Sequence, residues 1–253
     1  MSLGLNIVLI VGSAPDALTI KQRDLSLFSN CVVINNAWKL TKDWNYLIYP
    51  EDFPDKNLPP DAILTKKKIV TAREFVPEQN FFGGFVYGGG TMAFTAGYWA
   101  LGALKPDVIA YLGCDMIYKV KDGTTNHFYG NGQADPLRSD ITLQSLEAKS
   151  ARLMAFAQIN NCSVVNLSEL PESRLLFPRV STIQLFKEID QKNSLCTYDL
   201  KLDSKFVKRA FDLEKELGYM IPSGRYWEFL KEFDHLKLSE IDSLWLKSVS
   251  KLN

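Results

Sequence analysis

The stretch that decides the fold is FFGGFVYGGGTMAFTAGYWALGALKPDVIAYLGCD, which spans residues 81–115. Its glycines lead into Thr91, and the apolar residues after Thr91 are expected to form a helix that ends near Pro106. A short apolar run, 108–112, is typical of a buried strand, and it stops just before Asp115. A glycine loop, a helix, a strand and an acidic residue in this order indicate the centre of an open α/β sheet.

The glycine loop also predicts where an anion binds. Glycines before a helix let backbone N–H groups face an anion, and the helix dipole adds partial positive charge there. We therefore expect Gly89, Gly90 and Thr91 to face a phosphate or a sugar carboxylate. Asp115 is expected at the carboxyl ends of the strands, which is where parallel sheets bind their ligands.

The composition is that of an ordinary globular protein. With 253 residues, the chain can form one large domain or one domain with an appendage. Its formal net charge of +0 argues against non-specific binding of nucleic acid. The start lacks the basic segment of a signal peptide, and the longest apolar run is too short to cross a bilayer. We expect a cytoplasmic protein, and the sequence leaves contact with a membrane surface and self-association open.

Two further apolar runs end in small polar residues. The run 6–11 reads as a strand buried on both faces, and it breaks at Gly12-Ser13-Ala14-Pro15-Asp16. This break is either the first loop of a nucleotide-binding sheet or an ordinary tight turn. The run 31–34 ends at Asn35 and Asn36, which can bind a base, ribose or phosphate or can stabilise a turn.

The whole pattern predicts an α/β protein. We expect a Rossmann-like, open, mostly parallel sheet with helices on both faces over residues 1–180, and a helical C-terminal region over residues 181–253. The remaining strands are expected at 46–49, 62–64, 69–71 and 163–166. We expect a helix or a helical turn at 17–30, a helix at 140–161 with Asp140 as its cap, and several short helices after 180.

A long polar segment, 118–140, follows the central strand, and it carries His127. Loops of this length in a compact domain are often functional, so His127 is a candidate acid or base. The alternative is a surface histidine that bonds a backbone carbonyl. We favour the functional interpretation because polar residues, including Asn131, surround it.

Six short motifs resemble, in their order and spacing, those of one enzyme group. They are V-G-S-A-P, I-N-N, the glycine-to-helix unit, G-C-D, H-F-Y-G and N-L-S. These are the bacterial lipooligosaccharide sialyltransferases and their wider Rossmann-like relatives, which include hydroxymethylpterin diphosphokinases and flagellin-glycosylation proteins. The resemblance covers roughly residues 5–180. It implies a Rossmann-like domain that binds a CMP-linked sugar donor.

The resemblance also implies roles for single residues. The first loop would contact the nucleotide, with Ser13 replacing the amide side chain of the family, and Asn35 would bind the donor, with Asn36 as the alternative register. The nucleotide and donor contacts that it implies, together with those inferred from the residues, fall on Gly12, Ser13, Ala14, Asp16, Asn35, Asn36, Gly89, Gly90, Thr91, Tyr118, Tyr129 and Asn131.

One position departs from the family. The family segment H-Y-x-G-H ends in the proposed base, whereas here His127-Phe128-Tyr129-Gly130 is followed by Asn131. An amide cannot take up a proton near neutral pH. His127 would then have to serve as the base instead.

We therefore expect a glycosyltransferase-like enzyme that uses a nucleotide-activated sugar of the CMP-sialic acid type and an unknown acceptor. His127 or Asp115 would deprotonate the acceptor hydroxyl, and no metal would be required. One alternative is a diphosphokinase-like phosphoryl transfer in which Asp115 and Asp140 hold Mg²⁺. Another is an inactive module that binds nucleotides.

Overall fold

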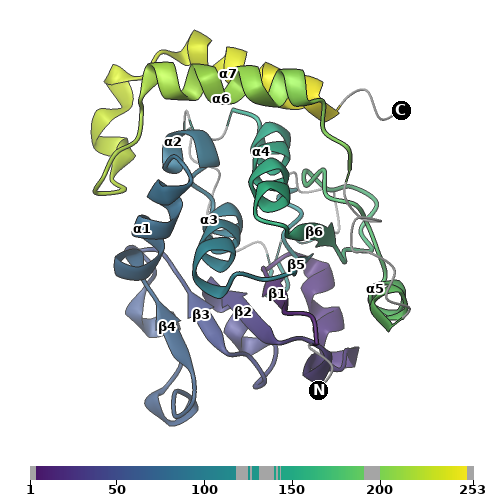
Figure 1. Cartoon of the computed structure of the whole chain (residues 1–253). Helices are drawn as coiled ribbons and strands as arrows, with labels where there is room; N and C mark the ends of the chain where they lie inside the picture. The colour runs from purple at the N-terminus through teal and green to yellow at the C-terminus, as the bar shows by residue number, and fades with distance from the viewer. Residues whose placement is uncertain are drawn as a thin grey trace.

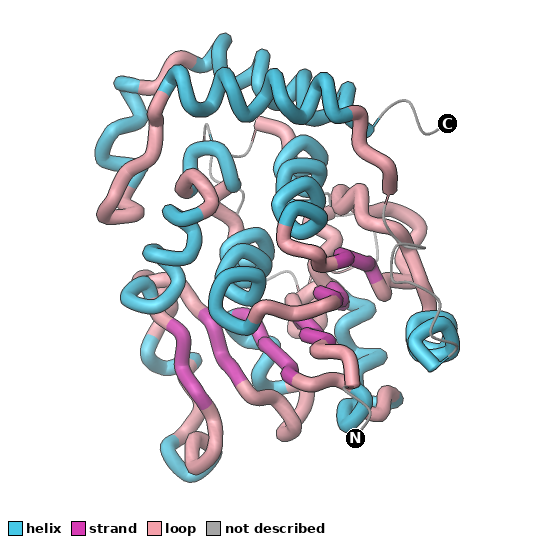
Figure 2. Tube along the Cα trace, in the orientation of Figure 1, coloured by secondary structure: helices cyan, strands magenta, loops and turns pink. Residues whose placement is uncertain are grey.

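The protein is described here by a computed structural model. The structure describes residues 4–117, 125, 127–130, 140, 142, 144–190 and 200–249, without the side chains of 188–190. Its centre is one sheet of six strands, all parallel (Figures 1 and 2). This confirms the predicted α/β class.

The strands follow the order β4-β3-β2-β1-β5-β6 across the sheet. The first strand, β1, pairs with β2 on one side and with β5 on the other. Strands β2 to β4 therefore extend the sheet from one edge of β1, and β5 and β6 extend it from the opposite edge. Their bounds are β1 Ile7–Val11, β2 Asn30–Ile34, β3 Tyr46–Ile48, β4 Lys68–Val70, β5 Val108–Leu112 and β6 Ser163–Asn166.

One predicted strand, 62–64, is wrong. Its place is taken by a 3-10 turn over Asp61–Ile63, closed by a hydrogen bond from the Ile63 N–H to the Pro60 carbonyl. Pro60 precedes the turn and cannot donate a backbone hydrogen bond to a sheet, which favours the turn over a strand.

The side chains of successive residues in each strand point to opposite faces of the sheet, because a strand is pleated. On β1, Val8 and Ile10 join one hydrophobic cluster, while Leu9 and Val11 join the other. The two clusters explain why the strands are continuous apolar runs, since both faces are covered.

The first face carries the helices that follow β4 and β5. Helix α3 is extended by a π-helical segment (Ala100–Leu104). The predicted helix over 140–161 starts later than expected, at Leu146, because the Ser145 side chain, rather than Asp140, accepts the capping hydrogen bond from the Ala148 N–H. The helices on this face are α1 Ala72–Phe81, α2 Phe85–Gly88, α3 Met92–Trp99 and α4 Leu146–Ile159.

The second face carries shorter elements. The helix or helical turn predicted over 17–30 takes the form of two 3-10 segments that are separated by Arg23 and Asp24, and Asp24 caps the second segment. Its elements are Pro15–Gln22, Leu25–Leu27, Asn35–Lys39 and α5 Thr182–Asp190, and a further 3-10 turn spans Asp55–Asn57.

The C-terminal region is helical, as predicted. Helices α6 (Ser204–Leu217) and α7 (His235–Val249) run together across α2 and α4 (Figure 1), and a 3-10 segment (Tyr226–Glu232) joins them. Two buried ion pairs, Arg152–Glu214 and Lys149–Asp242, fix them to α4. In the part of the chain that the structure describes, no helix combines the length and apolar character that a bilayer span needs.

Candidate functional site

A cavity of about 90 Å³, open to solvent on one side, lies at the carboxyl ends of β1, β2 and β5. It lies where the strand order reverses between β1 and β5, which is the position at which open α/β sheets bind ligands. Seven of the residues predicted from the sequence line it: Gly12, Ser13, Ala14, Asn35, Thr91, His127 and Tyr129.

The floor of the cavity is built by the loops after β1 and β5. The Gly12 N–H donates to the Leu112 carbonyl, and the Ala14 N–H donates to the Gly113 carbonyl. A Cβ atom on Gly12 would lie 2.6 Å from the Cys114 sulfur, so only glycine lets the two loops pack this closely. The close packing of the two loops that form the floor therefore requires glycine at position 12.

A Ser–His pair lies at one wall of the cavity. The Ser13 hydroxyl and His127 Nδ1 are 2.8 Å apart, and the Phe128 N–H donates to the Ser13 carbonyl at 2.9 Å. These two contacts fix the His127 turn to the first loop. When the Nδ1–H donates to Ser13 Oγ, the lone pair of the ring lies on Nε2, which can then take up a proton.

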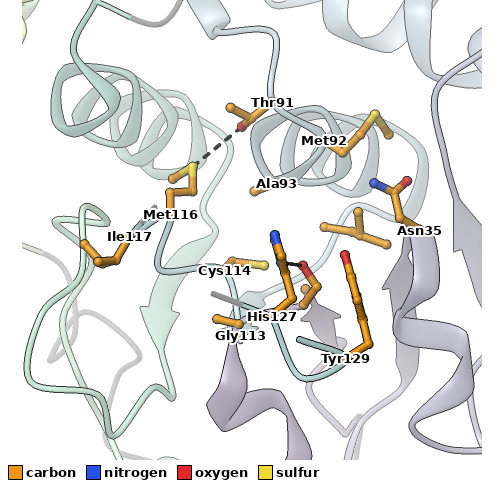
Figure 3. Close-up of a pocket in the computed structure, with 14 residues that line it drawn as sticks. Asn35, Thr91, Met92, Ala93, Gly113, Cys114, Met116, Ile117, His127 and Tyr129 are labelled. Atoms are coloured by element: carbon orange, nitrogen blue, oxygen red, sulfur yellow. Dashed lines mark hydrogen bonds between the residues drawn. The ribbon is translucent and has the colours of Figure 1, made fainter. Parts of the chain in front are cut away.

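The ring of His127 is also held by an aromatic stack. Its plane is 3° from that of Tyr129, with ring centroids 5.1 Å apart. Figure 3 shows the two side chains rising together toward the space bordered by Ala93 and Asn35. His127 is 9% exposed, so its ring faces the cavity rather than bulk solvent.

Asn35 lies opposite, at the end of β2. Its backbone adopts the left-handed conformation with φ of 51°, which asparagine tolerates better than most residues. Its buried Oδ1 accepts no hydrogen bond from the residues that the structure describes. The side chain can therefore serve a ligand.

The N-terminus of α3 forms the upper wall in Figure 3, with Thr91, Met92 and Ala93. Thr91 caps the helix by accepting from the Phe94 N–H at 3.4 Å, and its hydroxyl contacts the Met116 sulfur at 3.7 Å. The first N–H groups of a helix have no partner within the helix, so this end of α3 favours an anion.

The glycine loop differs from the expectation. The N–H groups of Gly88 and Gly89 donate to the carbonyls of Gly84 and Phe85, and the Gly90 N–H donates to the Thr142 hydroxyl at 3.1 Å. The prediction that these N–H groups point at an anion is wrong, because α2 and Thr142 use them. Gly89 and Gly90 position α3 instead of lining the cavity.

The predicted acidic residues Asp16 and Asp115 are buried or half-buried outside the lining of the cavity. Asp115 is 0% exposed and accepts a hydrogen bond from the Asn166 amide at 3.3 Å. Burial raises the pKa of the Asp16 carboxyl, and the nearby Asp115 raises it further. Neither carboxylate lines the cavity, and Asn36 does not line it either.

Several lining residues were not predicted as binding residues: Ile34, Met92, Ala93, Gly113, Cys114, Met116 and Ile117. Most are apolar and look like core residues in the sequence. Burial raises the pKa of the Cys114 thiol well above its usual value, so this thiol stays protonated. Two signals marked Gly113 and Cys114 in the sequence, namely their position at the end of a predicted strand and their place in the G-C-D motif of the resemblance.

Tyr118 and Asn131 lie outside the described residues. Asp140, proposed above as a Mg²⁺ ligand with Asp115, accepts hydrogen bonds from the Thr142 N–H and the Tyr226 hydroxyl. Among the described residues, no group of three or more His, Cys, Asp and Glu side chains is placed to hold a metal ion.

A second cavity shares no lining residue with the first, and part of its wall is the segment that precedes β5. It is lined by Glu78, Phe81, Phe82, Leu101, Gly102, Lys105, Pro106 and Asn160. None of the predicted site residues lines it.

Comparison with protein-family models, with curated proteins and with solved structures gave no match.

Proposed function

We propose that the chain is a glycosyltransferase-like enzyme that uses a nucleotide-activated sugar, with a CMP-sialic acid type of donor. One observation carries the proposal: the Ser13–His127 pair and the N-terminus of α3 border the same cavity, at the switch point of the sheet. A group that can take up a proton thus lies beside a place that favours an anion.

The binding half of the site has two parts. Backbone N–H groups of Met92 and Ala93 would face the donor's phosphate, with the dipole of α3 adding positive charge. Asn35 and the loop from Gly12 to Ala14 would hold the nucleoside, since they border the cavity at the ends of β2 and β1.

The chemical step moves one glycosyl group. The acceptor hydroxyl gives its proton to His127 Nε2 as its oxygen forms a bond to the anomeric carbon of the sugar. The bond between that carbon and the phosphate oxygen breaks, and the electron pair leaves with the nucleoside monophosphate. The N-terminus of α3 stabilises the leaving phosphate, and Ser13 keeps the imidazole in the required tautomer.

The geometry gives less support to Mg²⁺-dependent phosphoryl transfer. That reaction needs carboxylates that reach the metal at the nucleotide, whereas Asp115 is buried against Asn166 and Asp140 is engaged by Tyr226. A binding module without activity is the remaining alternative, and it differs from both enzymes in binding a nucleotide without turnover.

Binding is tested by thermal denaturation with CMP, CDP, UDP, and ATP with and without Mg²⁺. A ligand at about 100 times its Kd adds roughly 2.7 kcal/mol of stability, or about 5–10 °C in Tm for a chain of this size. We expect CMP and CDP to raise Tm without metal. Stabilisation by ATP with Mg²⁺ alone would favour phosphoryl transfer, and no shift with any nucleotide would reject both enzymes.

Turnover is tested by CMP release from a CMP-linked sugar. His127→Gln removes the proton acceptor, and we expect the rate to fall by about 10²–10⁴-fold while CMP still binds. His235→Gln is the matched control, because His235, the other histidine, is exposed on α7. Full activity in His127→Gln would remove this residue from the mechanism, and CMP binding without turnover in the wild type would favour the inactive module.

A further inference from the structure

A chain of hydrogen bonds joins the C-terminal region to the glycine loop. The Tyr226 hydroxyl donates to Asp140 Oδ2 at 2.5 Å, and the Thr142 N–H donates to Asp140 Oδ1 at 2.7 Å. The Gly90 N–H in turn donates to the Thr142 hydroxyl at 3.1 Å. Gly90 directly precedes Thr91, the cap of α3. The chain thus runs from the C-terminal region to the helix end that borders the cavity.

The tyrosine is held where this chain needs it. Tyr226 is buried, and its ring stacks on Phe85 of α2 with centroids 6.0 Å apart and an angle of 20° between planes. A Cβ atom on Gly90 would lie 3.0 Å from Tyr226 Cζ, and even closer to its oxygen. Because Gly90 has no side chain, the tyrosine hydroxyl can lie against the loop. Gly90 thus has a structural role in place of the predicted role in binding an anion.

The element that carries Tyr226 is firmly attached to the rest of the molecule. It lies between α6 and α7, which are fixed to α4 by the buried pairs Arg152–Glu214 and Lys149–Asp242. The tyrosine hydroxyl is thus a fixed point against which the loop before α3 can be set.

We propose that Tyr226 is a positioning residue for the anion-binding N-terminus of α3, and that it acts through Asp140 and Thr142. The C-terminal region then completes the site without touching the ligand. This inference rests on the proposed function for its consequence, namely the affinity for a nucleoside monophosphate. Its structural half concerns the protein without ligand.

The first test measures hydrogen exchange in the ligand-free protein, at Gly90 and at the first turn of α3. Tyr226→Phe keeps the ring and removes the hydroxyl, and we expect roughly 5- to 10-fold faster exchange there, which corresponds to the loss of one hydrogen bond. Asp140→Asn should have a similar effect, and the double variant should add little, because both residues belong to one chain of contacts.

Tyr219→Phe is the matched control. Its hydroxyl also lies in the C-terminal region, where it accepts from the Asp234 N–H at 3.1 Å, and its ring stacks on Tyr87. Among the described residues, its hydroxyl forms no hydrogen bond with Asp140, Thr142 or Gly90. We expect this variant to leave exchange at Gly90 unchanged even if its Tm falls as much as that of Tyr226→Phe.

The second test measures CMP affinity and donor kinetics in the same variants. Tyr226→Phe should weaken CMP binding by roughly 5- to 10-fold and raise KM with little change in kcat, because His127 is untouched. Faster exchange without CMP binding in any variant would reject the proposed function and keep the positioning role. Unchanged exchange in Tyr226→Phe, or an equal change in Tyr219→Phe, would overturn the inference.

Discussion

Gly12 shows how single residues set the shape of this site. Its N–H pairs with the end of β5, and the place where a side chain would lie is filled by Gly113 and Cys114. The residue has the same effect whatever ligand the cavity takes, because it determines how closely the two loops pack.

Gly12→Ala is therefore expected to destabilise the protein by about 1–3 kcal/mol, since the loops after β1 and β5 must move apart. Urea denaturation measures the change. Gly4→Ala is the matched control, because a Cβ atom there has nothing within 4 Å. Equal stability of the Gly12 variant and the wild type would contradict the close packing of the floor.

Asp16 gives a prediction about pH. Burial and the neighbouring Asp115 raise the pKa of its carboxyl above the ordinary value of 3.8. Above the raised pKa, the folded protein holds a charge that the unfolded chain solvates better, so the charge destabilises the fold. Below 3.8 both states are protonated and this effect disappears.

Asp16→Asn should therefore raise Tm at neutral pH, and the gain should shrink as the pH falls through the raised pKa toward 3.8. Asp24→Asn is the opposite case, because hydrogen bonds from Ser26 lower the pKa of Asp24, so this variant should lose stability at neutral pH. Melting curves across the pH range measure both. A gain for Asp16→Asn that does not depend on pH would contradict the assignment.

At this scale, the sequence predicted polar residues better than apolar ones. Ser13, Asn35 and His127 follow strands or stand in a polar loop, so their chemistry marks them before the fold is known. Met116 and Cys114 look like core residues in the sequence, and only the packing of loops distant in the chain brings them to the cavity. The partners of Gly89 and Gly90 were equally unpredictable, because Thr142 lies 52 positions from Gly90.

At the scale of the elements, the contact between α4 and α6 depends on a buried charge that needs several partners. Arg152 is 1% exposed, and its guanidinium donates to both oxygens of Glu214, to the Tyr98 hydroxyl and to the Phe82 carbonyl. Burial lowers the pKa of Arg152, but Glu214 and Tyr98 more than offset this and raise it above its usual value. The buried guanidinium of Arg152 is stable only while these partners, and Glu214 above all, balance its charge.

Glu214→Ala is expected to cost about 3–5 kcal/mol, because it leaves a buried guanidinium without its counter-charge. Asp212→Ala, on the same helix, removes an exposed i,i+4 partner of Lys208, and we expect a much smaller loss of stability because solvent screens this pair. Urea denaturation compares the two. Similar losses in both variants would show that the buried pair does not hold α6 in place.

The elements were predictable where local patterns decide them. Apolar runs marked β1, β2, β5 and β6, and glycine and proline breaks marked the C-terminal helices. The missed features are those in which a side chain changes a boundary, such as Ser145 at the start of α4 or Pro60 before a turn. The spacing of hydrophobic residues along the sequence gives no information about such side-chain contacts.

At the scale of the molecule, the sheet and the C-terminal region share one hydrophobic cluster, which runs from Val8 and Ile109 to Leu213 and Trp245. The predicted boundary near residue 180 falls close to the start of α5, but the core continues past it. This shared packing places Tyr226 above the glycine loop, and no pattern within either half of the sequence indicates it.

We propose that the cavity at the switch point binds the nucleotide of an activated sugar. Hydrogen exchange with and without saturating CMP tests it most directly. We predict slower exchange at residues 12–14, at Asn35 and at residues 91–93, with no change around Phe81 and Leu101, which line the second cavity. No protection by CMP, or protection confined to the second cavity, would contradict the claim.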